Sequence, residues 1–228
     1  MESILIVDDE RVLRDGLKNL LTAEGYDVRL ARDGEDALKC ISAKRPDLVL
    51  LDVMMPKMNG FRCCEEIRRS DALLPVIFLT AKDADADQVR GLGLGADDYV
   101  SKDAGDSVLL ARVKRALARV SGLRAESPAN GSQIALGAVV VDTRAFSVVD
   151  RGKTIAYLTR TEMDLLKVFD AHRDEVLVID DLISELRGSG FACEDAMLYS
   201  HVANLRRKLG SAAPLLVNRR GVGYCLLR

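Results

Sequence analysis

The sequence predicts two domains of different class: an α/β domain with a doubly wound, five-stranded parallel sheet, then a domain of short strands and three helices. Three observations support this prediction. The first half alternates short apolar runs with segments of helical periodicity, a Gly-, Ser-, Pro- and Asn-containing stretch follows, and the second half opens with β-rich runs separated by turn residues. A chain of 228 residues is long enough for two cores. We expect domains at 1–120 and 133–228, joined by a linker at 121–132.

Five short runs of the first domain read as strands. Most of them are apolar throughout, as expected for parallel strands that are covered on both faces. Between them lie residues with helical spacing, such as Leu13, Leu17 and Leu20, so each strand should be followed by a helix. In such folds the ligand site lies beyond the carboxyl ends of the strands. The expected strands are Ile4–Val7, Val28–Leu30, Leu48–Leu51, Val76–Leu79 and Tyr99–Val100.

The second domain begins with short strands and continues with three helices. Thr159 and Glu162 form a capping box that opens the first helix. The second and third helices are expected at about 179–186 and 194–209, because Gly188 and Gly210 follow them. A Gly-rich hairpin closes the chain at 215–227. The expected strands are Val139–Val141, Ser147–Val149 and Thr154–Ala156.

Composition argues against several classes of protein. No apolar run approaches the ~18 residues that span a bilayer, and the first residues lack the basic start of an export signal. The five cysteines are odd in number and have no zinc-ligand spacing, so we expect reduced thiols. Together these features predict a cytoplasmic protein without membrane association.

The net charge of −2 hides a basic C-terminal end. No acidic residue follows Asp195, so a local surface for a polyanion is expected there. The basic residues after this point are Arg206, Arg207, Lys208, Arg219, Arg220 and Arg228.

Acidic residues follow the first and third predicted strands. Asp8 and Asp9 come directly after the first strand, and Asp52 comes after the third. Because these strand ends meet at one edge of the sheet, the three carboxylates should share a cleft and require a cation, for which oxygen ligands favour Mg²⁺. A carboxylate in such a site can accept a phosphoryl group. Lys102 and Thr80, which follow the fifth and fourth strands, could contact the phosphoryl oxygens.

This set of residues resembles the receiver domain of two-component response regulators. The resemblance covers 1–120 and implies a flavodoxin-like fold in which Asp52 accepts a phosphoryl group from a sensor histidine kinase. It implies that Asp9, Asp52 and the Met54 carbonyl bind Mg²⁺, with Asp8 acting through water, and that Thr80 and Tyr99 form the switch. The motifs are Asp8-Asp9, Asp52-Val53-Met54-Met55-Pro56 with Gly60, Thr80-Ala81, Gly95-Ala96-Asp97-Asp98-Tyr99 and Lys102.

Asp103 departs from the family pattern, which has proline after the lysine and a cis peptide there. A cis peptide before a residue other than proline costs about 3–4 kcal/mol, so we expect a trans or rearranged loop. Asp103 also adds negative charge beside the proposed phosphoryl site. We hypothesise that phosphorylation is retained but slower or weaker, and an Asp103→Pro variant with unchanged rate and extent of phosphorylation would refute this.

The third helix of the second domain has two distinct faces. Leu198, Val202, Leu205 and Leu209 share one face, which should pack on the core. The opposite face carries small residues, one amide and one guanidinium, a combination that suits the DNA major groove, with Arg206 and Lys208 flanking it near phosphates. The residues of this opposite face are Ala196, Ser200, Ala203, Asn204 and Arg207.

The C-terminal part resembles the winged-helix effector of the OmpR/PhoB family. The resemblance spans about 133–228 and predicts a winged helix-turn-helix domain that binds double-stranded promoter DNA. It implies that Asn204 and Arg207 lie near bases, Arg220 in the minor groove, and His201, Arg206 and Arg219 near phosphates; His201 could equally cap or pack locally. The motifs are Leu158-Thr159 with Glu162 and Leu165-Leu166, His201-Val202 with Leu205-Arg206-Arg207-Lys208-Leu209, and Arg220-Gly221-Val222-Gly223-Tyr224.

The family resemblance also implies a homodimer on tandem DNA repeats. Asp97 and Asp98 against Arg112 and Arg119 could supply charge pairs across the receiver face, each contributing about 0–1 kcal/mol. RNA polymerase is a further candidate partner.

Two other functions remain open. The receiver could be a constitutive dimerisation module in a regulator that does not depend on phosphorylation, although retention of the acidic residues, Thr80, Tyr99 and Lys102 argues against this. A Mg²⁺-dependent phosphatase fits less well, because the pocket lacks a general base beyond the metal ligands. We therefore expect no enzyme beyond the receiver's own phosphorylation and dephosphorylation.

Overall fold

A computed structural model describes residues 1–80, 96–125, 133–188 and 195–228. The chain divides into two compact units, Met1–Ala125 and Glu126–Arg228, and each is described by itself. Four cysteines in the described residues are free thiols. No helix in this part of the chain is long and apolar enough to cross a membrane.

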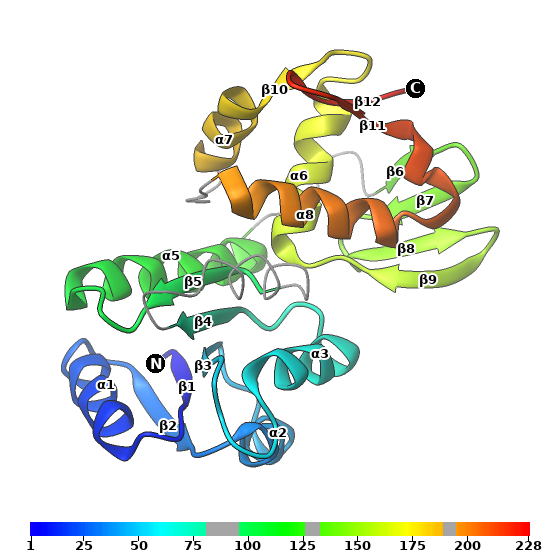
Figure 1. Cartoon of the computed structure of the whole chain (residues 1–228). Helices are drawn as coiled ribbons and strands as arrows, with labels where there is room; N and C mark the ends of the chain where they lie inside the picture. Colours follow the sequence, from blue (N-terminus) through cyan, green and yellow to red (C-terminus); the bar gives the residue numbers. More distant parts are fainter. Residues whose placement is uncertain (81–95, 126–132, 189–194) are drawn as a thin grey trace. The chain divides into compact units, whose positions relative to one another are not determined.

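The first unit contains the predicted five-stranded sheet, with strand order β2-β1-β3-β4-β5 and every pair parallel. Its central strands β1, β3 and β4 are buried along their whole length, which explains their continuous apolar sequence. The receiver-type α/β prediction is thus confirmed (Figure 1). The strands are β1 Ser3–Val7, β2 Asp27–Ala31, β3 Leu48–Asp52, β4 Val76–Thr80 and β5 Asp98–Ser101.

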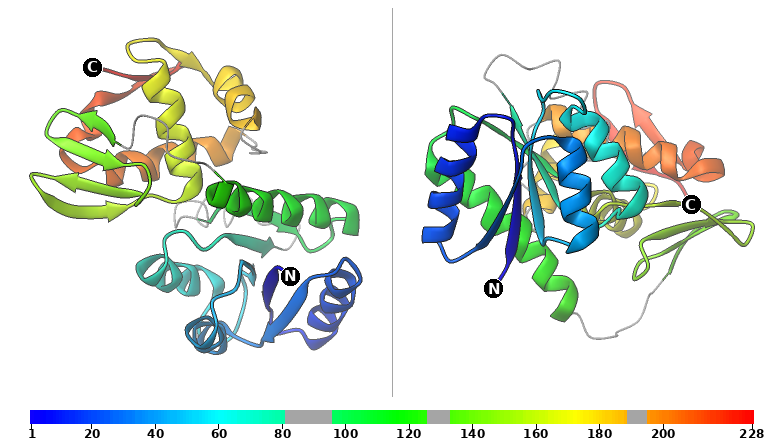
Figure 2. Two further views of the ribbon diagram at one scale, coloured as in Figure 1. Left: turned by 180° about the vertical axis from the view of Figure 1, so that it is seen from behind. Right: turned by 90° about the horizontal axis from the view of Figure 1, so that it is seen from below.

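Helices cover both faces of this sheet. Figure 2 shows α1 and α5 on one face and α2 and α3 on the other. On the first face, Leu109 and Val113 of α5 pack with Ile4, Leu50 and Ile77 of the sheet in one apolar core. The helices are α1 Arg11–Ala23, α2 Gly34–Ala43, α3 Gly60–Ser70 and α5 Asp106–Ala125.

The end of α5 differs from the predicted domain boundary. The helix continues to Ala125, so residues 121–125 are helical rather than linker. The reason is local: Val120, Leu123 and Ala125 are compatible with a helix, and Gly122 alone does not end it. Residues 126–132 of the predicted linker, and the helix expected after β4, lie outside the described residues.

The second unit opens with a four-stranded antiparallel sheet of order β6-β7-β8-β9. Three of its strands were predicted, but β6 was not, because its four residues lie directly beside the expected linker. Three helices follow, then a short 3-10 helix and the C-terminal hairpin, whose strand β12 also pairs with β10. The elements are β6 Gln133–Leu136, β7 Val139–Asp142, β8 Ser147–Asp150, β9 Lys153–Tyr157, α6 Arg160–Ala171, β10 Leu177–Val178, α7 Ile179–Gly188, α8 Asp195–Lys208, η1 Gly210–Leu215, β11 Leu216–Arg219 and β12 Gly223–Leu226.

The capping box predicted from the sequence starts α6. The Thr159 hydroxyl accepts a hydrogen bond from the Glu162 backbone N–H at 3.4 Å, and the Glu162 carboxylate accepts one from the Thr159 N–H at 2.7 Å. These two bonds satisfy donors that the first helical turn leaves without a partner.

Gly223 fixes the base of the hairpin. A Cβ atom at this position would lie 1.9 Å from the Leu177 carbonyl oxygen, closer than any real contact allows. Only glycine lets β12 approach β10 this closely, so Gly223 permits the pairing of these two strands.

Candidate functional sites

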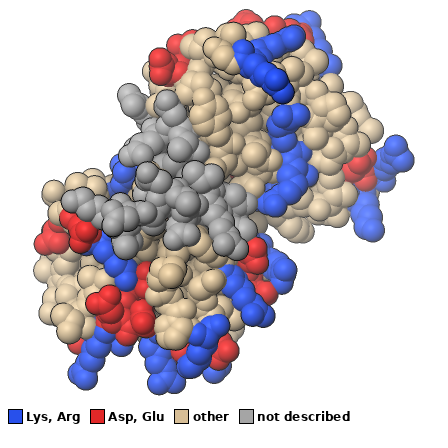
Figure 3. Space-filling view, in the orientation of Figure 1, with Lys and Arg blue, Asp and Glu red and all other residues tan. Residues whose placement is uncertain are grey.

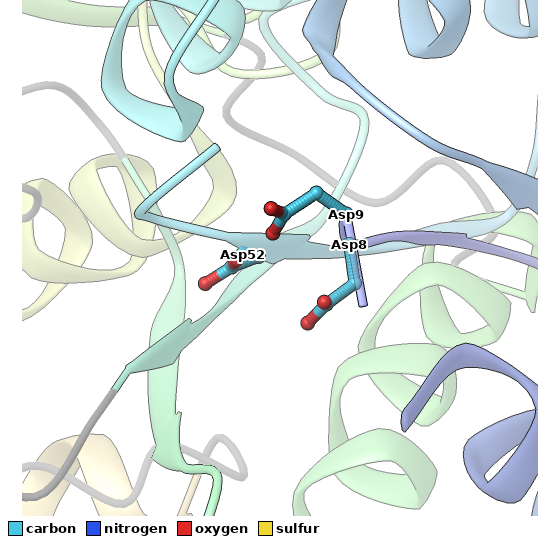
Figure 4. Close-up of side chains that lie close together, drawn as sticks. All are labelled: Asp8, Asp9 and Asp52. Atoms are coloured by element: carbon cyan, nitrogen blue, oxygen red, sulfur yellow. The ribbon is translucent and has the colours of Figure 1, made fainter. Parts of the chain in front are cut away.

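Three carboxylates lie together at the carboxyl edge of the first sheet. Asp8 and Asp9 follow β1, and Asp52 ends β3, the strand beside it. One oxygen from each carboxylate lies within 4.8 Å of the others (Figure 4). Asp8 and Asp52 are 0% and 2% exposed, whereas Asp9 is open to solvent. The predicted juxtaposition of these three residues is therefore present.

Lys102 lies in the same cluster. Its ammonium nitrogen is 2.8 Å from Asp8 Oδ2 and 3.0 Å from Asp52 Oδ2. The Lys102 backbone N–H also donates to the Thr80 carbonyl at 2.7 Å, which holds the end of β5 against the end of β4. Glu10 Oε1, which the sequence did not single out, is 4.0 Å from the same ammonium.

Burial and charge perturb the titration of this cluster. Burial, together with the neighbouring Asp8 carboxylate, raises the pKa of Asp52 to about 6, although Lys102 opposes the shift. Burial alone would lower the pKa of Lys102, but its hydrogen bonds to Asp8 and Asp52 outweigh burial and raise it. The lysine therefore stays charged, and Asp52 is mainly ionised at neutral pH.

Thr80 and Tyr99 are both buried. The Thr80 hydroxyl has no hydrogen-bond partner among the described residues, and the residue is 2% exposed. A buried hydroxyl without a partner costs free energy, about 1–3 kcal/mol, unless a ligand or water satisfies it. Tyr99 is 9% exposed, so its ring lies within the unit.

The backbone at Gly60 packs closely against the backbone at Asp52 and holds the loop between them. The sequence identified Gly60 only as part of a motif. A Cβ atom on Gly60 would lie 2.1 Å from the Asp52 carbonyl oxygen, and the Gly60 N–H donates to the Val53 carbonyl at 3.0 Å. The Met54 N–H donates to Asp52 Oδ1 at 3.3 Å, while its side chain is 70% exposed. Gly60 thus positions the backbone that carries Asp52 and Met54.

These donors fit a hard divalent cation. Clustered carboxylates, two of them buried and one with a raised pKa, repel one another, and oxygen ligands of this kind match Mg²⁺. Asp8, Asp9 and Asp52 could hold the ion, whose charge would add to that of Lys102 in offsetting their mutual repulsion.

Asp103 is exposed, and its backbone N–H donates to the Ser101 hydroxyl at 3.3 Å. The described peptide bonds are all trans, in agreement with the expectation for this loop.

The carboxylates expected to form charge pairs across a dimer face have ion-pair partners within the chain. Asp97 lies 2.8 Å from Arg68, and Asp98 lies 2.6 Å from Arg112. Burial raises the pKa of Asp98, although the Arg112 guanidinium opposes this shift. Because these carboxylates are already paired, the proposed intermolecular pairs would need to replace internal ones. The side chain of Arg119 lies outside the described part of the structure.

The second unit carries a basic surface along α8 and the hairpin. Figure 3 shows Lys and Arg side chains extending from the hairpin toward α8 on one face. Arg207, Arg219 and Arg220 are exposed, and Arg206 is half-buried. Tyr199 is 49% exposed and lines a cavity of about 290 Å³ together with Arg219 and Arg220. A basic surface is thus present at the predicted place, and its contact with a polyanion stays a prediction.

Three of the candidate DNA-contact residues of α8 are buried. Ser200, His201 and Asn204 are 9%, 0% and 4% exposed. For His201 this burial favours local packing, one of the two alternatives that the sequence left open. The Asn204 side-chain oxygen accepts a hydrogen bond from Arg207 at 3.1 Å. The helical period alone placed Ser200 and Asn204 opposite the core, and it does not encode that these two residues are buried while Arg207 on the same face is exposed.

Lys208 has a structural partner. Its ammonium lies 2.7 Å from the fully buried Glu162 carboxylate, which also closes the capping box of α6. The expected contact of Lys208 with phosphate stays a prediction, and it would require this ammonium to leave Glu162. Local sequence gives no sign of the pair, since 46 residues separate the partners.

Family models match both parts of the chain: the response regulator receiver domain matches residues 4–114, and the C-terminal domain of transcriptional regulatory proteins matches residues 152–226. The chain is similar to the response regulator MprA of Mycolicibacterium vanbaalenii, with 38% identity over 228 residues, 98% of this chain and 96% of the relative. MprA of Mycobacterium ulcerans is 39% identical over 225 residues, with the same shares.

Solved structures support the fold. A RitR mutant superposes with a TM-score of 0.76 over 99% of both chains at 24% identity, a likeness that concerns the fold alone. A receiver-domain protein from Clostridium thermocellum has a TM-score of 0.51 and 26% identity, and covers 54% of this chain and 99% of its own. With its acidic strand-end cluster and its basic winged-helix unit, the chain belongs to the two-component response regulators with an OmpR/PhoB-type DNA-binding domain.

Proposed function

We propose that Asp52 accepts a phosphoryl group from the phosphohistidine of a sensor histidine kinase, and that this modification promotes receiver dimerisation and sequence-specific binding to promoter DNA. One observation carries the proposal: a buried carboxylate with a raised pKa lies 3.0 Å from Lys102 and beside two further carboxylates. An Asp52 oxygen forms the new P–O bond as the P–N bond breaks, and the imidazole nitrogen takes up a proton.

The surrounding residues are suited to hold the product. Mg²⁺ bound by Asp8, Asp9, Asp52 and the Met54 carbonyl would neutralise phosphoryl oxygens when present. Lys102 would move its ion pair from Asp52 to the phosphoryl group, and the buried Thr80 hydroxyl would gain a partner. Tyr99 would complete the switch behind Thr80.

In the effector, the exposed arginines are the proposed DNA contacts. Arg207 would reach bases, Arg220 the minor groove, and Arg206 and Arg219 phosphates. Asn204 and Ser200 would contribute only if their side chains became exposed. RNA polymerase remains a proposed partner, and a homodimer the proposed active state.

The alternative is a DNA-binding regulator whose receiver dimerises constitutively. The acidic cluster with Lys102 argues against it, because a receiver that served only for dimerisation would not require these residues.

The test compares oligomeric state and DNA affinity with and without a beryllofluoride–Mg²⁺ phosphoryl mimic, for wild type and Asp52→Asn. DNA sites are first selected from a random pool with the wild-type chain and the mimic. We expect the mimic to drive dimerisation and to tighten binding at least tenfold in wild type only. Equal dimerisation and DNA binding without the mimic would establish the constitutive alternative.

Mg²⁺ binding should depend on pH. Protons compete with the ion for Asp52, whose pKa is about 6, so affinity should fall roughly tenfold between about pH 7.5 and pH 5 and level off above pH 7. The raised pKa means that protonated Asp52 is favoured in the folded state, so without metal the folded receiver loses stability as pH rises from about 4 to 6. Calorimetric Mg²⁺ titrations at several pH values, in buffers of different ionisation enthalpy, measure both the affinity and the protons released. A flat profile would contradict this assignment.

A further inference from the structure

We propose that the receiver unit has a second binding site, a cavity between α1 and the β5–α5 segment that takes a small amphipathic cation: an apolar body with an ammonium group. The cavity measures about 440 Å³, within the range of ligand pockets. Leu13, Leu17 and Leu20 of α1 form one wall, and Ala104 and Leu109 form the other. We call it the α1–α5 cavity.

The chain itself leaves this space unfilled. Gly16 lines the cavity from the middle of α1, and a Cβ atom there would have no atom within 4 Å. Glycine destabilises the interior of a helix, and Gly16 is an exposed residue within α1. Helix propensity therefore does not explain a glycine at this position. On the opposite wall, Ala104 presents only a methyl group to the cavity. Apolar walls with no side chain between them are suited to an apolar ligand group.

The rim of the cavity is acidic. Glu10 is the residue before α1, yet its side chain makes no capping hydrogen bond, and it is 69% exposed. Asp106, in the first turn of α5, is also exposed and lines the cavity. The lysine at the rim, Lys102, is closer to Asp8 and Asp52 than to Glu10, at 2.8 and 3.0 Å against 4.0 Å.

Charge complementarity therefore selects a cation. The charge of Lys102 is offset by the two buried carboxylates behind it, so Glu10 and Asp106 leave excess negative charge at the opening. An ammonium group at the opening would be attracted by these carboxylates, while an aliphatic or aromatic body enters the cavity beside Leu17 and Ala104. A neutral analogue would gain the apolar contact alone, and a carboxylate would be repelled.

The probe is 4-phenylbutylamine, titrated into the full chain and followed by amide and methyl NMR shifts, with 4-phenylbutanol and 4-phenylbutyrate as charge controls. We expect saturable shifts centred on Gly16 and Ala104, with affinity falling from the amine to the alcohol to the carboxylate. No beryllofluoride is present, so the result does not depend on the proposed phosphoryl chemistry. Absence of saturable shifts, or a stronger interaction of the carboxylate, overturns the proposal.

Two sets of variants test the two parts of the argument. Gly16→Leu and Ala104→Phe, made separately, fill the cavity from opposite walls and should weaken amine binding at least tenfold. The double variant Glu10→Gln, Asp106→Asn should weaken the amine about threefold to fivefold and leave the alcohol unchanged. Lys18→Gln, an exposed change on α1 outside the cavity lining, is the matched control. If both cavity-filling variants fold, as judged by their NMR spectra, and still bind the amine like wild type, the assigned site is wrong.

Discussion

Replacement of Lys102 by alanine is expected to abolish most of the response to the phosphoryl mimic while leaving the receiver folded. The Lys102 ammonium lies within 3.0 Å of both Asp8 and Asp52. It is also the group proposed to form an ion pair with the phosphoryl oxygens once Asp52 is phosphorylated. A hydrogen bond to a charged group contributes about 1.5–3 kcal/mol, so loss of this contact should weaken binding of the mimic by roughly 10- to 100-fold. Equilibrium titration with beryllofluoride at fixed Mg²⁺ measures the effect.

The same variant should change the titration of Asp52. Lys102 lowers the pKa of this carboxyl, so its removal should raise that pKa further and move the pH dependence of Mg²⁺ binding upward. Lys57→Ala is a suitable control, because Lys57 makes an ion pair with Asp33 at 2.7 Å in a neighbouring loop and does not contact Asp52. If Lys102→Ala responded to the mimic as Lys57→Ala does, the role assigned to Lys102 would be untenable.

Glu162→Ala should be the most destabilising of the single changes considered in the effector. It removes the second half of the capping box and leaves the Lys208 ammonium, which is 20% exposed, without its partner. Loss of a cap costs about 0.5–2 kcal/mol, and removal of one member of a buried pair costs about 3–5 kcal/mol. Since Lys208 keeps some solvent, we expect a total loss of about 2–4 kcal/mol. Hydrogen exchange of α6 and α8 in the full chain measures it, and receiver peptides serve as an internal reference.

Two further variants separate these contributions. Glu162→Gln keeps a side-chain acceptor for the Thr159 N–H but removes the charge, whereas Lys208→Met removes the cation and keeps the capping box. If the pair matters, the Glu162→Gln, Lys208→Met double variant should be more stable than the sum of the single losses predicts. Strict additivity would mean that Lys208 does not stabilise Glu162, and its predicted contact with phosphate would then cost no internal ion pair.

The sequence alone determined both folds and the acidic cluster. Period-two and period-3.6 patterns, with apolar runs at the centre of the sheet, are local signals of buried strands and amphipathic helices. Strand ends of a parallel sheet lie at one edge, so the positions of Asp8, Asp52 and Lys102 directly after their strands are enough to place them together. The capping box of Thr159 and Glu162 was readable because both partners lie within four residues.

Only the tertiary structure decided which polar groups are already paired. Lys208 and Glu162, Asp97 and Arg68, and the close approach of Gly223 to Leu177 join segments that are distant in sequence. The burial of His201 and Asn204, and the α1–α5 cavity, likewise depend on how neighbouring elements pack. A helical period gives the direction of a side chain, but the neighbour it meets is set by the three-dimensional arrangement of the other elements.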